Sequence, residues 1–164
     1  MLRVWDTFAG SIPDEDLKNR MLARLPRGEL TTHEVRKTSL ALHADNSKRI
    51  PTPYISFTSS LDAAIRLANE RKHQWHRGDQ NIVVIDPWYR LQRGLPILDM
   101  GKEMEQYGVE NPYRENYYTD HYICLWEVTP AEVVGTWSCN FLRRVDGWYE
   151  NIIMPEFRKH RETI

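Results

Sequence analysis

Five residues of the types that bind metal ions or carry protons are spread along the chain: His43, Asp45, His73, His76 and His121. Structural zinc sites place their ligands at compact, recognisable spacings. These five residues share no such pattern, and His73 and His76 lie three residues apart in a polar segment that we expect to end a helix. We therefore predict no metal site and assign these two histidines to a solvated helix surface.

The pair His121 and Cys124 has the residue types of a cysteine nucleophile and its general base. However, Cys124 lies inside an apolar run, so we expect it to pack in the core. Cys124 and Cys139 are the only cysteines, and their spacing matches neither a metal site nor a secreted disulfide framework. We expect reduced thiols.

Arg3, Ser56 and Thr58 are polar residues within strand-like segments. The planar guanidinium of Arg3 suits phosphate, to which arginine makes paired charge-assisted bonds, but it also suits an ion pair with Asp6 or Glu132. The Ser56 hydroxyl either meets a ligand or bonds the backbone of its own turn. Thr58 has the same two alternatives, because hydroxyls in this turn are expected to cap the helix that follows.

The elements that position these residues follow from residue patterns. Short apolar and β-branched runs bounded by turn residues predict strands, and apolar residues at helical spacing after a capping residue predict helices. The predicted strands are Leu2–Trp5, Tyr54–Thr58, Asn81–Ile85, Tyr122–Val128 and Val133–Trp137. The predicted helices run from Ser11 to about Leu25, from Thr31 to before Asn46, and from Leu61 onward, while Gly94–Tyr118 is predicted to be a long loop with short elements.

Helices early and strands mostly later favour an α+β class. The length of 164 residues predicts a single domain spanning 1–164, and 41% hydrophobic with 27% charged residues predicts a folded chain. The net charge of -1 gives no global attraction to nucleic acid or to a membrane surface. Without an apolar run long enough to span a bilayer or an N-terminal signal core, we expect a cytoplasmic protein.

Three segments, in this order, resemble the ADP-ribosyltransferase superfamily, particularly its enterotoxin-like branch: Leu2–Trp5, Pro53–Ala64 and Asp120–Val134. That branch has a signature of an Arg, a Ser-Thr-Ser strand and a late Glu. The first segment supplies Arg3. The second supplies Ser56 and Thr58 at the first and third places of the strand motif, with Phe57 in the middle place. In the third, counting back from Val128 places His121 where the family has its catalytic Glu.

The resemblance implies a fold in which N-terminal helices pack on a split, antiparallel-rich β core. It also implies NAD+ as substrate without a metal, with Arg3, Ser56 and Thr58 as cofactor-binding residues. His121 and its neighbour Asp120 take the catalytic positions. Over about residues 1–138, the chain more closely resembles a widespread fungal domain family of unknown function. The residues that carry this resemblance include Arg49–Ser56 and Tyr122–Leu125.

Two functions follow from this resemblance. The first is an NAD+-dependent mono-ADP-ribosyltransferase with a protein acceptor, or an NAD+ glycohydrolase. The second is a catalytically inactive module of the same fold that binds a nucleotide or a protein partner. His121 favours the second, because imidazole cannot replace a carboxylate in stabilising a developing oxocarbenium ion.

Overall fold

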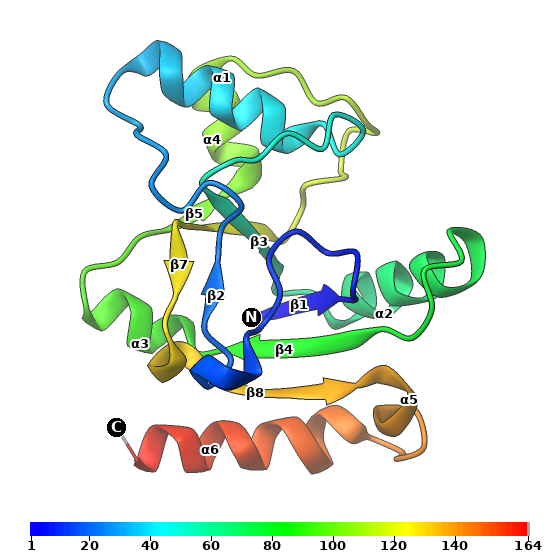
Figure 1. The fold of residues 1–164 in the computed structure, drawn as a ribbon. Helices are drawn as coiled ribbons and strands as arrows, with labels where there is room; N and C mark the ends of the chain where they lie inside the picture. Colours follow the sequence, from blue (N-terminus) through cyan, green and yellow to red (C-terminus); the bar gives the residue numbers. More distant parts are fainter. Residues whose placement is uncertain (164) are drawn as a thin grey trace.

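The computed structural model describes residues 1–163, and in this range six strands form one antiparallel sheet (Figure 1). The sheet order is β5-β6-β3-β1-β4-β8. The strands are β1 (Leu2–Trp5), β3 (Tyr54–Thr58), β4 (Asn81–Ile85), β5 (Ile97–Asp99), β6 (His121–Leu125) and β8 (Val133–Ser138). A separate ribbon pairs β2 (Met21–Leu22) with β7 (Glu127–Val128).

Helices connect these strands and cover the sheet. The α-helices are α1 (His33–Ala44), α2 (Leu61–Asn69), α3 (Pro87–Gln92), α4 (Met100–Tyr107), α5 (Cys139–Leu142) and α6 (Met154–Glu162). The helical turns are 3-10 turns at Glu15–Leu17 and Pro130–Glu132 and π-helical turns at Glu70–Gln74 and Tyr149–Ile153. The mixture of an antiparallel sheet with helices confirms the α+β class.

Because side chains alternate along each strand, the core residues lie on both faces of the sheet. On one side, Ile55, Phe57 and Cys124 pack with Met21 and Val128 of the β2–β7 ribbon. On the other side, neighbouring residues of the same strands pack on helices. There, α1 and α4 cover one half of the sheet and α2, α5 and α6 cover the other (Figure 1).

The predicted helix from Ser11 to about Leu25 is wrong. This segment forms a 3-10 turn at Glu15–Leu17 and the short strand β2. Lys18 and Asn19 adopt left-handed backbone angles, with φ of 53° and 63°, which end the helical turn. Met21 is buried in the core, whereas its neighbour Leu22 is exposed. This alternation fits a strand, and the segment buries no continuous apolar stripe of the kind that would stabilise a helix. Consequently α1 is the one α-helix before β3 in the described chain, rather than one of several N-terminal helices.

The predicted strand Tyr122–Val128 is split in two. Trp126 has a left-handed φ of 61° and separates β6 from β7, so the chain leaves the main sheet to join the ribbon. Gly94–Tyr118 contains β5 and α4, as expected for a long segment with short elements. The strands β1, β3 and β4 match their predicted bounds.

A buried ion pair joins the ribbon to α3. Arg90 Nη1 lies 2.6 Å from Glu132 Oε1, and both side chains are almost fully buried. Arg90 also donates to the main-chain oxygens of Pro96, Leu125 and Glu127, so its charge is satisfied by several acceptors. Glu132 in turn accepts from the backbone and hydroxyl of Thr129. This network anchors the turn between β7 and β8.

None of the helices within residues 1–163 is long and apolar enough to cross a membrane.

Candidate functional site

Arg3 contacts Ser56 across the junction between β1 and β3. The two strands pair through Leu2 and Thr58, so the side chains of Ser56 and Thr58 share the face of Leu2 and Val4, whereas the side chain of Arg3 leaves the other face and reaches the edge of β3 from there. Arg3 Nη1 donates to the main-chain oxygen of Ser56 at 3.0 Å, and Arg3 Nε donates to the main-chain oxygen of Ser11 at 2.9 Å. The first and second segments of the sequence motif are therefore in direct contact.

The charge of Arg3 has no carboxylate partner within 4.0 Å among the described residues, so neither Asp6 nor Glu132 takes the ion-pair role considered for it. Burial, followed by the charge of the neighbouring Arg71, lowers the pKa of Arg3 to about 10. Arg3 still carries a full positive charge at neutral pH. A half-buried cation satisfied only by main-chain carbonyls favours an anionic ligand.

The side chain of Ser56 is held by a histidine of α1. His43 Nε2 lies 2.7 Å from Ser56 Oγ, and His43 Nδ1 lies 2.7 Å from Thr52 Oγ1. Burial lowers the pKa of His43 to about 3, with further contributions from His121 and Arg3. The imidazole is therefore neutral, with one ring nitrogen donating and the other accepting.

A serine hydroxyl bonded to a neutral imidazole is the pairing that activates a nucleophile in some enzymes. Here the other imidazole nitrogen meets the hydroxyl of Thr52 instead of a carboxylate. An imidazole with a pKa near 3 accepts a proton poorly, because a general base works best with a pKa near the working pH. The contact orients the Ser56 hydroxyl without activating it.

His121 begins β6 and lies opposite Thr58 in the strand pairing. Its Nε2 atom is buried and has no hydrogen-bond partner within the part of the chain described, and its ring meets that of Tyr118 edge-on at 5.1 Å between centroids. Burial, followed by the charge of Arg3, lowers the pKa of His121 to about 4. His121 is thus a neutral imidazole at physiological pH.

Asp120 and Thr58 lie at the edge of this group. Asp120 is exposed and has a left-handed φ of 57°, and its main-chain oxygen accepts from Ser59 N at 3.0 Å. Thr58 Oγ1 accepts from Ser60 N at 3.0 Å, and Ser60 Oγ caps α2 by accepting from Ala63 N. The Thr58 hydroxyl therefore supports the turn after β3. The centre of the candidate site consists of Ser56, His43 and His121 on one face of the sheet, with Arg3 reaching the main chain of Ser56 from the other face.

The sequence patterns do not place His43 in this site. They suggest it only as a candidate metal ligand, and within residues 1–163 no group of three or more His, Cys, Asp or Glu is arranged to hold a metal ion. A signal existed in the chain: His43 comes near the end of α1, and two prolines then lead directly into β3. This short connection favours an end of α1 that lies near β3.

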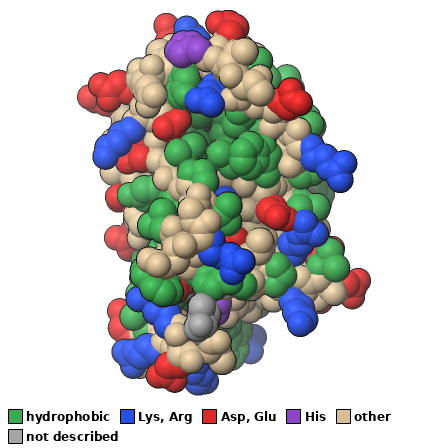
Figure 2. All heavy atoms as spheres, turned by 90° about the vertical axis from the view of Figure 1, so that its left-hand side faces the viewer, with side chains coloured by type: hydrophobic (Ala, Val, Ile, Leu, Met, Phe, Trp, Pro, Cys, Tyr) green, Lys and Arg blue, Asp and Glu red, His purple; other side chains and the backbone are tan. Residues whose placement is uncertain are grey.

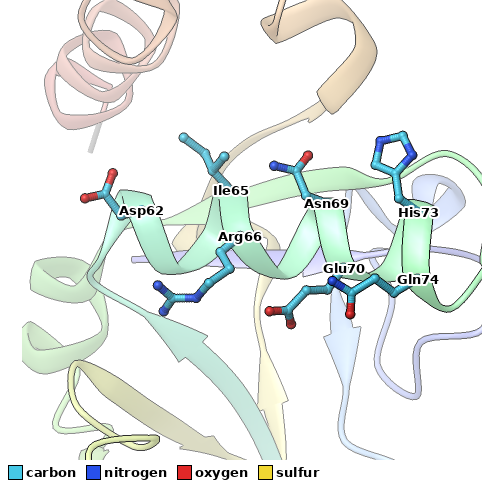
Figure 3. Close-up of a pocket in the computed structure, with 7 residues that line it drawn as sticks. All are labelled: Asp62, Ile65, Arg66, Asn69, Glu70, His73 and Gln74. Carbon is cyan, nitrogen blue, oxygen red and sulfur yellow. The ribbon is translucent and has the colours of Figure 1, made fainter.

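Hollows elsewhere on the surface include a groove and a shallow depression. The groove, of about 740 Å³, is bordered by Gly28, Tyr54, Tyr107 and Trp126 among others, on the face where hydrophobic side chains gather (Figure 2). The depression, of about 380 Å³, lies along the outer side of α2, and Figure 3 shows its lining from Asp62 to Gln74. Neither lining includes Arg3, Ser56 or His121.

Comparison with known proteins gives one family. No curated protein and no solved structure matches the chain. A family described as "Domain of unknown function (DUF7587)" matches residues 3–142, a range that includes Arg3, His43, Ser56 and His121. Because this match covers most of the chain, the protein belongs to that family of domains.

Proposed function

We propose that this chain is an ADP-ribosyltransferase-like domain that binds NAD+ or a related ADP-ribose compound without transferring ADP-ribose. The observation that carries the proposal is the contact of Arg3 with Ser56 at 3.0 Å. It joins the arginine strand and the serine strand on which the resemblance rests. The half-buried cation and the oriented hydroxyl suit the phosphate and ribose of such a ligand.

The charges around the group argue against transfer. Cleavage of the bond between nicotinamide and ribose develops positive charge on the ribose, which an enzyme stabilises with a negative group. The group contains the cation of Arg3 and two neutral imidazoles, His43 and His121. Asp120 lies on the exposed turn before β6. The net positive charge of these residues stabilises a bound anion and destabilises an oxocarbenium ion.

The test measures binding and chemistry separately. Calorimetry with NAD+ and with ADP-ribose reports binding, and nicotinamide release at high protein concentration reports cleavage. Ser56→Ala should weaken binding, because it removes the oriented hydroxyl, whereas Ser59→Ala on the neighbouring exposed residue serves as the matched control.

We expect NAD+ or ADP-ribose to bind, with weaker binding in Ser56→Ala, unchanged binding in Ser59→Ala and no nicotinamide release. Binding of neither compound to the wild-type protein would overturn the proposed ligand. Release of nicotinamide by the wild-type protein would overturn the absence of transfer and favour a transferase or glycohydrolase. In that case Asp120→Asn tests the remaining carboxylate candidate, which the contact of Ser59 N with Asp120 O holds beside the turn after β3.

A further inference from the structure

Three guanidinium groups gather around the second half of β1 and the residues that follow it. Arg3 belongs to β1 itself. Arg71 Nη1 donates to the main-chain oxygen of Val4 at 2.9 Å, and Arg77 Nη2 donates to Asp6 Oδ1 at 2.6 Å. Arg71 and Arg77 come from the π-helical turn after α2 and from the loop behind it, so two distant parts of the chain supply the cluster.

Within residues 1–163, one of these three cations, Arg77, forms an ion pair with a carboxylate. Asp6 is 1% exposed and accepts from both Arg77 and Phe8 N. Arg3 and Arg71 form no ion pair with any of residues 1–163. The cluster therefore holds an excess of positive charge in a partly buried place.

The guanidinium of Arg71 has a donor that makes no hydrogen bond within the described chain. One of its Nη1 hydrogens meets Val4 O, whereas its Nε atom is buried and has no partner in the described chain. Burial, and then the charge of Arg77, lowers the pKa of Arg71 to about 10, so it remains a cation at neutral pH. A buried donor without an acceptor costs free energy, so the described chain satisfies the guanidinium of Arg71 only in part. The π-helical geometry at Glu70–Gln74 is itself frequent at functional sites.

We infer that Arg3 and Arg71 together form a diphosphate-binding site at the end of β1. This inference rests on the proposed function, because it assigns the part of the nucleotide that these two residues hold. Each guanidinium presents a planar fork that fits phosphate oxygens, and two adjacent forks match the two adjacent phosphoryl groups of a diphosphate. Asp6 forms its ion pair with Arg77, and its charge also acts on Arg3 and Arg71 without forming an ion pair with either; its Oδ2 atom has no hydrogen-bond partner within residues 1–163.

Inorganic pyrophosphate is the probe, with inorganic phosphate for comparison. Calorimetry on the wild-type protein should show tighter binding of pyrophosphate than of phosphate. Arg71→Gln should weaken pyrophosphate binding roughly tenfold or more, because a charge-assisted interaction is lost. Arg66→Gln is the matched control, since Arg66 is an exposed arginine of the same helical segment and belongs to no ion pair of the cluster.

A measurement on the wild-type protein covers the case in which Arg71→Gln fails to fold. The Nε–H signals of arginine side chains in NMR spectra report contacts directly. The Arg71 signal should shift on addition of pyrophosphate, and the Arg66 signal should stay in place. Absence of any shift at Arg71, or equal weakening by Arg71→Gln and Arg66→Gln, would overturn the inference.

The same experiments separate this inference from the proposed function. Binding of pyrophosphate that depends on Arg71, with no binding of NAD+ or ADP-ribose, supports the diphosphate site and overturns the proposed ligand. Binding of NAD+ that is equally strong in Arg71→Gln and wild type supports the proposed function and overturns the role of Arg71.

Discussion

His43 Nε2 lies 2.7 Å from Ser56 Oγ, and this contact joins the end of α1 to the strand that carries the serine motif. The opposite ring nitrogen lies 2.7 Å from Thr52 Oγ1, so the imidazole bridges two hydroxyls. The main-chain oxygen of Ser56 is bonded by Arg3 at the same time. Ser56 is thus held through both its backbone and its side chain.

Replacement of His43 by alanine should destabilise the protein. His43→Ala leaves the Ser56 and Thr52 hydroxyls without this partner in a half-buried place, which costs about 1–3 kcal/mol in the free energy of unfolding. Urea denaturation at pH 7 measures this quantity. His73→Ala, on an exposed histidine, is the control and should change it by less than about 0.5 kcal/mol. Equal stability of the two variants would contradict a bridging role for His43.

The stability of the protein should fall as the pH decreases from about 6.5. The pKa values of His43 and His121 are lowered to about 3 and about 4 in the folded protein, mainly by burial. The unfolded chain, with ordinary histidine pKa values near 6.5, therefore binds more protons below that pH. Each histidine then removes up to about 1.4 kcal/mol of stability per pH unit until the pH reaches its folded pKa.

The double variant His43→Asn, His121→Asn should lose this part of the pH dependence. Urea denaturation of both proteins at pH 7, 6 and 5 compares the two slopes. Carboxylates contribute equally to the wild type and the variant, so the difference between the curves belongs to the histidines. Parallel curves would show that these imidazoles titrate normally in the folded protein.

Replacement of His121 by glutamate should introduce NAD+ cleavage if the proposed ligand is bound. His121 stands at the position where the resemblance expects a carboxylate, and glutamate would supply the negative charge that stabilises an oxocarbenium ion. Nicotinamide release by His121→Glu, measured by chromatography, should exceed that of wild type and of the neutral control His121→Gln. Binding of NAD+ by His121→Glu without any release would mean that the position does not face the ribose.

The buried ion pair between Arg90 and Glu132 gives a separate prediction about folding. Arg90→Met leaves Glu132 buried without its cation and should cost about 3–5 kcal/mol. The double variant Arg90→Met, Glu132→Gln removes the unpaired charge, so it should be more stable than Arg90→Met alone. Urea denaturation of the two variants decides the order of stability. The reverse order would mean that Glu132 keeps its charge satisfied by Thr129 without Arg90.

Several parts of the candidate site were predictable because their signals are local. Arg3 and Ser56 lie in β1 and β3, whose apolar and β-branched residues and flanking turns determine each strand separately. The cap of α2 by Ser60 was predictable for the same reason. The segment from Ser11 to Leu25 was not, since its helical propensity competes with burial of Met21 against the sheet.

The sequence by itself determined the α+β class, the strands that carry Arg3 and Ser56, and the absence of a carboxylate at position 121. Only the tertiary structure decided that Arg3 reaches Ser56, that His43 bridges to the same serine, and that Arg71 forms no ion pair within residues 1–163. The physical reason is the range of the interactions. Strands and caps depend on neighbouring residues, whereas these contacts depend on strand order and helix docking, which burial of the whole core selects.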